Sequence, residues 1–238
     1  MRPARSKHPL GSVIPLSART LLGTACLSLF SLQVSAGEEA PSKLADLTPF
    51  EAQYRLETRG WPSATINHKL SQEGLHWLSD MSFSVTIARG QEYSRFSVSE
   101  DSIRSLLYSS SYSLIGVGDS YQLNEDDIPS IDRQAALVDL SRRAGHENCT
   151  QSAPCDIEFV DHRGRDEHFQ YYSVPGLQTV SVPAGEFEAQ QVVLNDIEKP
   201  DRFLEINFHP DRPGLILSAE YRKEGRRQTR IRLTQFNP

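Results

Sequence analysis

Apolar and polar residues alternate along one long stretch, residues 75–88. Apolar side chains occupy nearly every second position, at Leu75, Trp77, Met81, Phe83, Val85 and Ile87. A period of two places successive side chains on opposite faces of a β-strand. The residues between are mostly polar or small, as on an antiparallel sheet that has one face on a core and one in water. We therefore predict a long strand here, with Trp77 and Phe83 on its inner face.

Shorter stretches along the chain repeat this alternation and are separated by Gly, Pro, Asp and Asn. The predicted strands before residue 110 cover 50–57, 66–70, 93–98 and 103–108, with turns at 72–74, 89–91 and 100–101. Those after it cover 156–162, 166–173, 180–182, 187–197, 203–209, 214–221 and 227–236. Closely spaced turn signals are typical of all-β folds. The fold class is therefore all-β: an antiparallel, strongly curved sheet or a partly open β-barrel.

One segment departs from the strand pattern. Residues 116–127 contain two glycines and three consecutive acids and predict a long loop, and Ser109–Ser111 predicts a flexible connection. Ser130 can cap a short helix over 131–144, which Gly145 can close. Ala135 and Val138 share the apolar face of this helix. We expect the helix to lie over the open side of the sheet, as a cover that its glycine-containing flanks allow to move.

The first 36 residues have the features of an export signal. Four basic residues and no acids precede or flank an apolar run over 21–32, which is followed by the small-residue sequence Val34-Ser35-Ala36. About a dozen apolar residues is shorter than the roughly twenty that a membrane-spanning helix needs. We predict cleavage after Ala36 and a periplasmic protein that does not span the membrane; an uncleaved anchor is the alternative. Residues 37–47 then form a flexible lead-in, and 48–238 a single β-barrel-like domain.

Removal of residues 1–36 makes the chain strongly acidic. The leader holds four of the 25 basic side chains and none of the 31 acidic ones, so 21 basic and 31 acidic side chains remain, a net charge of −10. A net negative charge repels nucleic acid and anionic membrane surfaces. We therefore expect no nucleic-acid partner.

Cys149 and Cys155 are the only cysteines outside the leader. In an oxidising compartment, two such cysteines predict a disulfide. A redox pair of the Cys-x-x-Cys kind does not fit their spacing, and no second pair of ligands supports zinc.

The sequence contains no recognisable catalytic or cofactor motif. It lacks a Gly-x-Ser-x-Gly elbow, a His-Glu-x-x-His motif and a glycine-rich phosphate loop. The most polar cluster, residues 161–168, is interpreted as a solvated hairpin end. We therefore predict no catalytic, cofactor-binding or metal-binding residues.

The C-terminal half resembles a known family. Val182-Pro183-Ala184-Gly185-Glu186-Phe187 and the later Ile206-Asn207-Phe208 strand are similar to a family of exported bacterial proteins called domain of unknown function 3108. The opening Phe50-Glu51-Ala52-Gln53-Tyr54 also resembles the first strand of that family, although its members usually carry Trp near Asn207-Phe208. The resemblance implies a periplasmic fold similar to the half-open barrels of lipoprotein carriers, and it brings no catalytic residues.

Two functional hypotheses follow. The first is a non-enzymatic module that binds a lipid, another hydrophobic ligand or an envelope lipoprotein, because a small barrel can enclose one ligand. Its candidate ligand contacts are Trp77, Phe83, Ala135 and Val138. The alternative is a structural or interaction protein of the cell envelope with a solid core and no ligand; an enzyme ranks third.

The cysteine hypothesis gives a direct prediction. Thiol titration of the denatured, exported protein should find no free thiol without reductant and two after reduction. Two free thiols before reduction would contradict a disulfide between Cys149 and Cys155.

Overall fold

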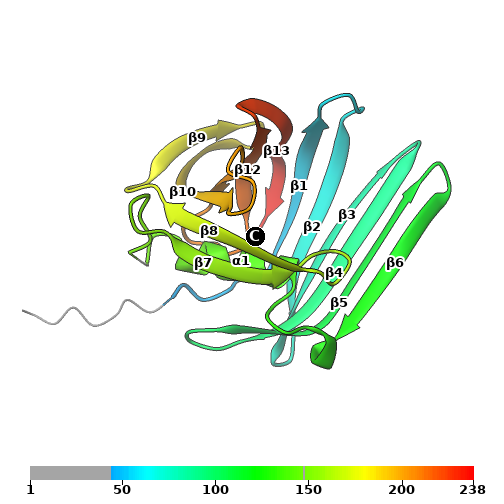
Figure 1. Ribbon diagram of the computed structural model, residues 1–238, viewed down its shortest axis with the longest axis horizontal. Coiled ribbons are helices and arrows are strands. Elements are labelled where there is room, and N and C mark those ends of the chain that lie inside the picture. Colours follow the sequence, from blue (N-terminus) through cyan, green and yellow to red (C-terminus); the bar gives the residue numbers. More distant parts are fainter. Residues whose placement is uncertain (1–43, 147) are drawn as a thin grey trace, which may run out of the picture. The chain divides into compact units, whose positions relative to one another are not determined.

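Thirteen strands in the described part of the chain pair as one antiparallel sheet (Figure 1). The computed structural model describes residues 44–146 and 148–238, so the expected export signal at 1–36 lies outside the described residues. The strands before the helix are β1 (Phe50–Thr58), β2 (Ala64–Glu73), β3 (His76–Val85), β4 (Ala88–Val98), β5 (Ile103–Leu114) and β6 (Val117–Asn124). A 3-10 turn, η1 (Glu125–Asp127), and the helix α1 (Arg133–Arg143) follow. The later strands are β7 (Cys155–Val160), β8 (Asp166–Ser173), β9 (Gln178–Val182), β10 (Gly185–Asp196), β11 (Arg202–Phe208), β12 (Ile216–Lys223) and β13 (Arg226–Asn237).

The sheet is strongly curved and open. Its strand order is β6-β5-β4-β3-β2-β1-β13-β12-β11-β10-β8-β7, and β9 pairs with β10. The first and last strands in the sequence, β1 and β13, are therefore neighbours in the middle of the sheet. Figure 1 shows β1–β6 as one broad layer and the C-terminal strands bent back beside it, with α1 between them. Bulges in four ladders, one at Gln53/Tyr54 between β1 and β13, add local twist and bend. The predicted fold class is confirmed.

The long alternating strand lies where the sequence predicted, with shorter ends. β3 begins at His76, and Leu75 is 88 % exposed in the preceding turn. Trp77 is buried, whereas Phe83, nearer the other end of the strand, is only half-buried. The period of two therefore gave the correct inner face and overestimated how far the core extends along it.

Two glycines that were interpreted as turn or loop signals lie inside strands instead. The turn expected at 89–91 lies at Thr86-Ile87, because Val85 pairs directly with Ala88. A Cβ at Gly90 would lie 2.4 Å from Cε1 of Phe83, its partner across the ladder. Gly90 therefore makes room for an aromatic ring, which is a packing role that the sequence alone does not reveal.

The predicted loop over 116–127 is also wrong in most of its length. Residues 117–124 form β6, which pairs with β5 along its whole length, and Ser109–Ser111 lie within β5. A Cβ at Gly118 would lie 1.8 Å from the carbonyl oxygen of Tyr112, so this glycine allows close approach of the two strands.

The helix begins two residues later than predicted because a stronger cap follows Ser130. Asp132 is the N-cap residue, and its Oδ1 accepts hydrogen bonds from the backbone N–H groups of Gln134 and Ala135 at 2.9 and 3.0 Å. Its Oδ2 accepts from the hydroxyls of Ser94 on β4 and Ser105 on β5 at 2.7 and 2.6 Å. One buried carboxylate thus caps α1 and attaches it to the sheet.

The segment between α1 and β7 contains the two cysteines. The sulfur atoms of Cys149 and Cys155 are bonded in a disulfide, with the Cα atoms 5.3 Å apart. The carbonyl of Cys149 also accepts from the backbone N–H of Ser173 at the end of β8, at 2.9 Å. These bonds hold the loop before β7 close to the β7–β8 hairpin.

Asp132 gives a stability prediction. Asp132→Ala should lower the free energy of unfolding by about 3 kcal/mol, because it removes a cap and leaves buried donors without an acceptor. Denaturant unfolding followed by circular dichroism measures this loss. Asp126→Ala, at an exposed position in η1, is the control and should change the value by no more than about 0.5 kcal/mol. Equal losses in the two variants would show that Asp132 does not anchor the helix.

Candidate functional site

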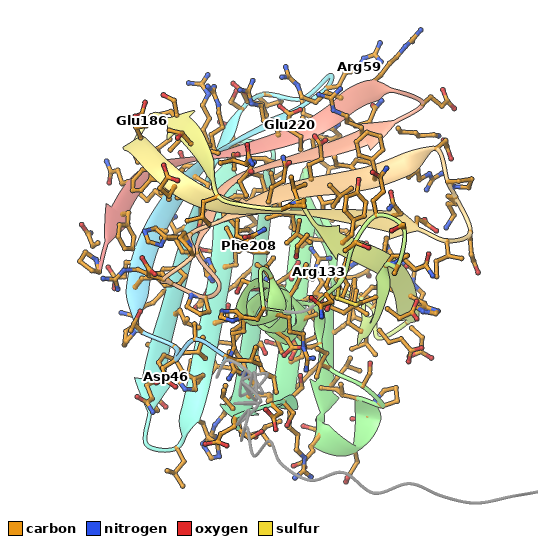
Figure 2. The ribbon with its side chains drawn as sticks, turned by 90° about the vertical axis from the view of Figure 1, so that its left-hand side faces the viewer. Asp46, Arg59, Arg133, Glu186, Phe208 and Glu220 are labelled. Carbon is orange, nitrogen blue, oxygen red and sulfur yellow. A yellow bond between two sulfur atoms is a disulfide. The ribbon has the colours of Figure 1, made fainter. Side chains whose placement is uncertain are left out.

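One face of α1 forms a wall of an interior cavity. Arg133, Ala136, Leu137 and Leu140 follow the i, i+3, i+4, i+7 spacing that places side chains on one side of a helix, and all four line the cavity. Figure 2 shows Arg133 beside the helix in the middle of the fold, whereas Glu220 lies at its upper edge. The apolar part of this wall is Ala136, Leu137 and Leu140.

The opposite wall comes from both halves of the sheet and from the β7–β8 hairpin. Its apolar side chains are Tyr54, Ile66, Met81, Ile157, Phe159, Phe169, Leu194, Phe203, Leu204, Ile206, Ile216, Ala219, Tyr221 and Ile231. Together the walls form a cavity of about 540 Å³ that is open to solvent. This volume lies within the range of roughly 300–1,000 Å³ that small-molecule sites occupy. The cavity is therefore large enough for a small apolar ligand.

The lining of the cavity also contains titratable side chains, and we call the part that carries them its mouth. The charged ones are Arg133, Asp161, Arg165, Glu167, Asp196, Lys199 and Arg202. His162 also lines this part, and burial lowers the pKa of its imidazole, so it is neutral at pH 7. An apolar interior below a charged rim fits an amphipathic molecule, with its apolar part inside and its polar end at the mouth.

The turn of the β7–β8 hairpin crosses the gap between the two free ends of the sheet. Ser110 on β5 donates a hydrogen bond to the carbonyl of His162, and Arg163 donates to the hydroxyl of Tyr112 at 3.0 Å. Gly164 packs beside Leu123 of β6. The expected solvated hairpin end is therefore docked on the other half of the sheet.

Asp161 fixes the conformation of this turn. Its buried carboxylate accepts from the backbone N–H groups of Arg163 and Arg165 at 2.7 and 3.0 Å, and from the guanidinium of Arg165 at 2.5 Å. Burial raises the pKa of Asp161, but the bonds from Arg165 and the backbone outweigh it and lower the pKa to about 2. Asp161 is thus a charged structural group and not a proton donor at neutral pH.

A chain of buried polar groups connects the sheet to α1 beside the cavity. The hydroxyl of Tyr54 lies 3.5 Å from Nδ1 of His68, and Nε2 of His68 lies 3.1 Å from Oγ of Ser79. Ser79 donates to the amide oxygen of Gln134 at 3.0 Å, and the amide nitrogen of Gln134 donates to Glu92 at 3.1 Å. Burial lowers the pKa of His68 to about 4, so this histidine is neutral at pH 7.

The far end of α1 is also attached. Arg142 donates to the backbone carbonyls of Ala45, Ser99 and Glu100, and the hydroxyl of Ser141 accepts from the backbone N–H of Gly214 at 2.6 Å. Bonds at both ends make α1 a fixed wall of the cavity. They do not support the movable cover that the sequence suggested.

None of the four predicted ligand contacts lines this cavity. Ala135 and Val138 are fully buried on the other side of α1, where Val138 packs beside Gly214. Trp77 is buried in the core and Phe83 lies over Gly90. The sequence thus predicted a helix in the interior, but it pointed to the face that packs into the core and not to the face that lines the cavity. Helical periodicity identifies apolar faces and does not say which of them lines a cavity.

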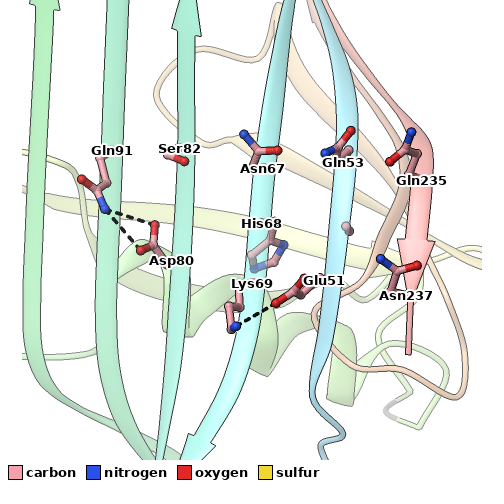
Figure 3. Close-up of a pocket in the computed structure, with 11 residues that line it drawn as sticks. Glu51, Gln53, Asn67, His68, Lys69, Asp80, Ser82, Gln91, Gln235 and Asn237 are labelled. Carbon is pink, nitrogen blue, oxygen red and sulfur yellow. Dashed lines mark hydrogen bonds and ion pairs between the residues drawn. The ribbon is translucent and has the colours of Figure 1, made fainter.

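A second hollow lies on the outer face of the sheet (Figure 3). It has a volume of about 320 Å³ and is lined mainly by amide, hydroxyl and charged side chains of β13 and β1–β4. Lys69 pairs with Glu51 at 2.7 Å, and Gln91 donates to Asp80. These side chains are typical of a hydrated sheet face, and we assign the site to the interior cavity instead.

Other kinds of site have no support in the described residues. No group of three His, Cys, Asp or Glu side chains there could hold a metal ion. Within 44–146 and 148–238, no helix combines the length and apolar character needed to cross a membrane.

Comparison with known proteins gives only distant similarities. No family model matches the sequence, and no curated protein matches it. Among solved structures, a chain of the complex structure of Pseudomonas aeruginosa MucA/MucB is 15 % identical with a TM-score of 0.39, over 79 % of this chain and 51 % of that one. The crystal structure of MucB is 13 % identical with a TM-score of 0.33, over 79 % and 52 %. The chain spans about half the length of these proteins, and similarity at this level identifies neither a family nor a function.

The neutral state of His68 predicts a pH effect on stability. An unfolded histidine binds a proton below about pH 6.5, whereas buried His68 stays neutral down to about pH 4. Lowering the pH from 7 to 4 should therefore favour the unfolded state, by about 3 kcal/mol from this residue.

The matched variant is His68→Gln, which keeps a polar group and cannot titrate. Unfolding free energies measured in denaturant at several pH values should fall less steeply for the variant than for the wild type. Because other residues titrate in both proteins, only the difference between the two slopes reports His68. Identical slopes would contradict a depressed pKa at this position.

Proposed function

We propose that this chain is a non-enzymatic binding protein of the bacterial periplasm that holds a hydrophobic ligand, such as a lipid or acyl chain, in the cavity beside α1. The observation that carries the proposal is the cavity of about 540 Å³, lined by apolar residues of α1 and of both halves of the sheet. The ligand-facing residues are then Ala136, Leu137 and Leu140 of the helix in place of Ala135 and Val138.

The periplasmic localisation and the family resemblance in this proposal are predictions from the sequence. The export signal and its cleavage after Ala36 lie outside the described residues. The resemblance to domain of unknown function 3108 has no support from a family model. The division into a lead-in at 37–47 and one domain at 48–238 also stays a prediction.

A second candidate function is surface contact with another envelope component, as the interaction-protein hypothesis expected. Exposed apolar residues gather at the tips of the β3–β4 and β5–β6 hairpins: Ile115 and Val117 are each 79 % exposed, and Ile87 is 42 % exposed. The two tips touch, since the backbone N–H of Ile115 donates to the carbonyl of Ile87 at 2.7 Å. Ile115 also has a φ of 52°, which is unfavourable for a β-branched residue. An apolar residue kept at a strained, exposed position favours a role in contact.

Filling the cavity tests the first candidate. The exported protein should bind a fluorescent fatty acid saturably at micromolar concentrations, and Leu137→Trp should weaken this binding by about tenfold or more, because the larger side chain occupies the site. Fluorescence titration measures the binding, and thermal unfolding reports whether the fold persists.

Leu114→Trp is the control, since Leu114 is 40 % exposed and does not line the cavity. It should bind the probe like the wild type. If the wild type shows no saturable binding, or if Leu137→Trp binds as well as Leu114→Trp, the cavity is not a ligand site. The hairpin-tip contact would then be the better candidate.

A further inference from the structure

The charged groups at the cavity mouth are mostly neutralised in pairs. Arg133 lies 3.0 Å from Glu92, Arg165 lies 2.5 Å from Asp161, and Lys199 lies 3.3 Å from Asp196. Each of these cations therefore has a carboxylate partner from the protein itself. One cation at the mouth differs from them.

The side chain of Arg202 makes no hydrogen bond or ion pair with the described residues, whereas its backbone N–H donates to the carbonyl of Lys199 at 2.9 Å. Its Nε is buried without a partner. The Nε atoms of Arg95, Arg222 and Arg232 are also buried without partners, but each of these side chains is bonded through another nitrogen. Arg202 is thus the half-buried cation at this mouth whose guanidinium makes no bond with the described residues.

The position of Arg202 directs it to the cavity. It is the first residue of β11, and the alternation of a strand places it on the same face as Leu204 and Ile206, which line the apolar wall. A buried N–H group without an acceptor is unfavourable unless another group accepts its hydrogen bond. A guanidinium offers up to five N–H donors and binds carboxylate or phosphate oxygens in pairs.

We infer that Arg202 is the head-group site of the cavity, and that the ligand is a single acyl or alkyl chain ending in an anionic group, either a carboxylate or a phosphate ester. This inference rests on the proposed function, since it needs the apolar part of the ligand to lie against α1. The chain occupies the space between Leu137, Leu140 and the β10–β13 wall, and its charged end meets Arg202 at the mouth.

One carboxylate at the mouth sets a limit on where the head group can lie. Glu167 on β8 lines the cavity and repels an anion. The anionic end is therefore expected at Arg202, away from Glu167, because Lys199 already pairs with Asp196 at 3.3 Å.

The test compares ligands that differ only in their end group. Palmitate, hexadecyl phosphate and the neutral hexadecanol would each compete with a bound neutral fluorescent probe in the intact exported protein. We expect both anions to bind about tenfold or more tightly than the alcohol, because a charge-assisted pair forms only with them. Either order of the two anions supports the site, and the order identifies carboxylate or phosphate as the better ligand.

Variants of Arg202 assign the preference to this residue. Arg202→Gln should remove the preference for anions and leave hexadecanol binding unchanged, and Arg202→Lys should restore part of it. Arg59→Gln, at the exposed turn between β1 and β2, is the matched control and should behave as the wild type. Thermal unfolding of each variant checks the fold.

The outcomes separate this inference from the proposed function. If the alcohol binds as tightly as the anions to the wild type, the cavity holds hydrophobic ligands and the head-group site is wrong. If the anion preference persists in Arg202→Gln, another cation makes the contact and the assignment is also wrong. If no ligand competes and the probe itself does not bind, the proposed function fails. Should Arg202→Gln not fold, the comparison of end groups in the wild type still decides whether an anion is preferred.

Discussion

The buried carboxylate of Asp132 is the contact on which the interior arrangement depends. It caps α1, accepts from hydroxyls on β4 and β5, and lies in a short parallel bridge with Val160 of β7. The backbone N–H of Val160 also donates to the carbonyl of Ile131 at 2.8 Å. Asp132 and its bridge partner Val160 therefore connect three parts of the structure: β4 and β5, the helix α1, and β7. Burial raises the pKa of Asp132, and the hydrogen bonds from Ser105 and Ser94 reduce that rise without cancelling it.

Fixing α1 in this way creates the cavity. The side of the helix that carries Ala135 and Val138 is buried in the core, and the side that carries Leu137 and Leu140 faces the open volume. The β7–β8 turn, held by Asp161, then crosses from the C-terminal half to β5 and β6. The cavity thus lies between parts of the chain that are far apart in sequence, and only its mouth carries charge.

Local patterns predicted most of the strands, and long-range contacts explain where they failed. Alternation gave the inner faces of β1–β3 and the hairpins after residue 155, because one buried face imposes a period of two. Gly90 and Gly118 were expected in a turn and a loop, but both lie in strands. Their small size leaves room for the ring of Phe83 and for the carbonyl of Tyr112. Ser130 was a plausible cap, but the partners of Asp132 lie 27 and 38 residues away. The cavity and the unpaired state of Arg202 follow from contacts among helix, hairpin and sheet, and no local pattern encodes them.

The size of the cavity helps to decide between a ligand-binding module and a solid structural protein. The apolar side chains that line the cavity of about 540 Å³ face water whenever it is empty, and each Å² of apolar surface left in water costs roughly 25 cal/mol. A protein selected only for a solid core could remove much of this cost with larger side chains at Ala136 or Ala219, both of which line the cavity. Small residues at these positions, fixed walls and a mouth with one guanidinium that lacks a partner in the described residues are together better explained by an occupant than by incomplete packing.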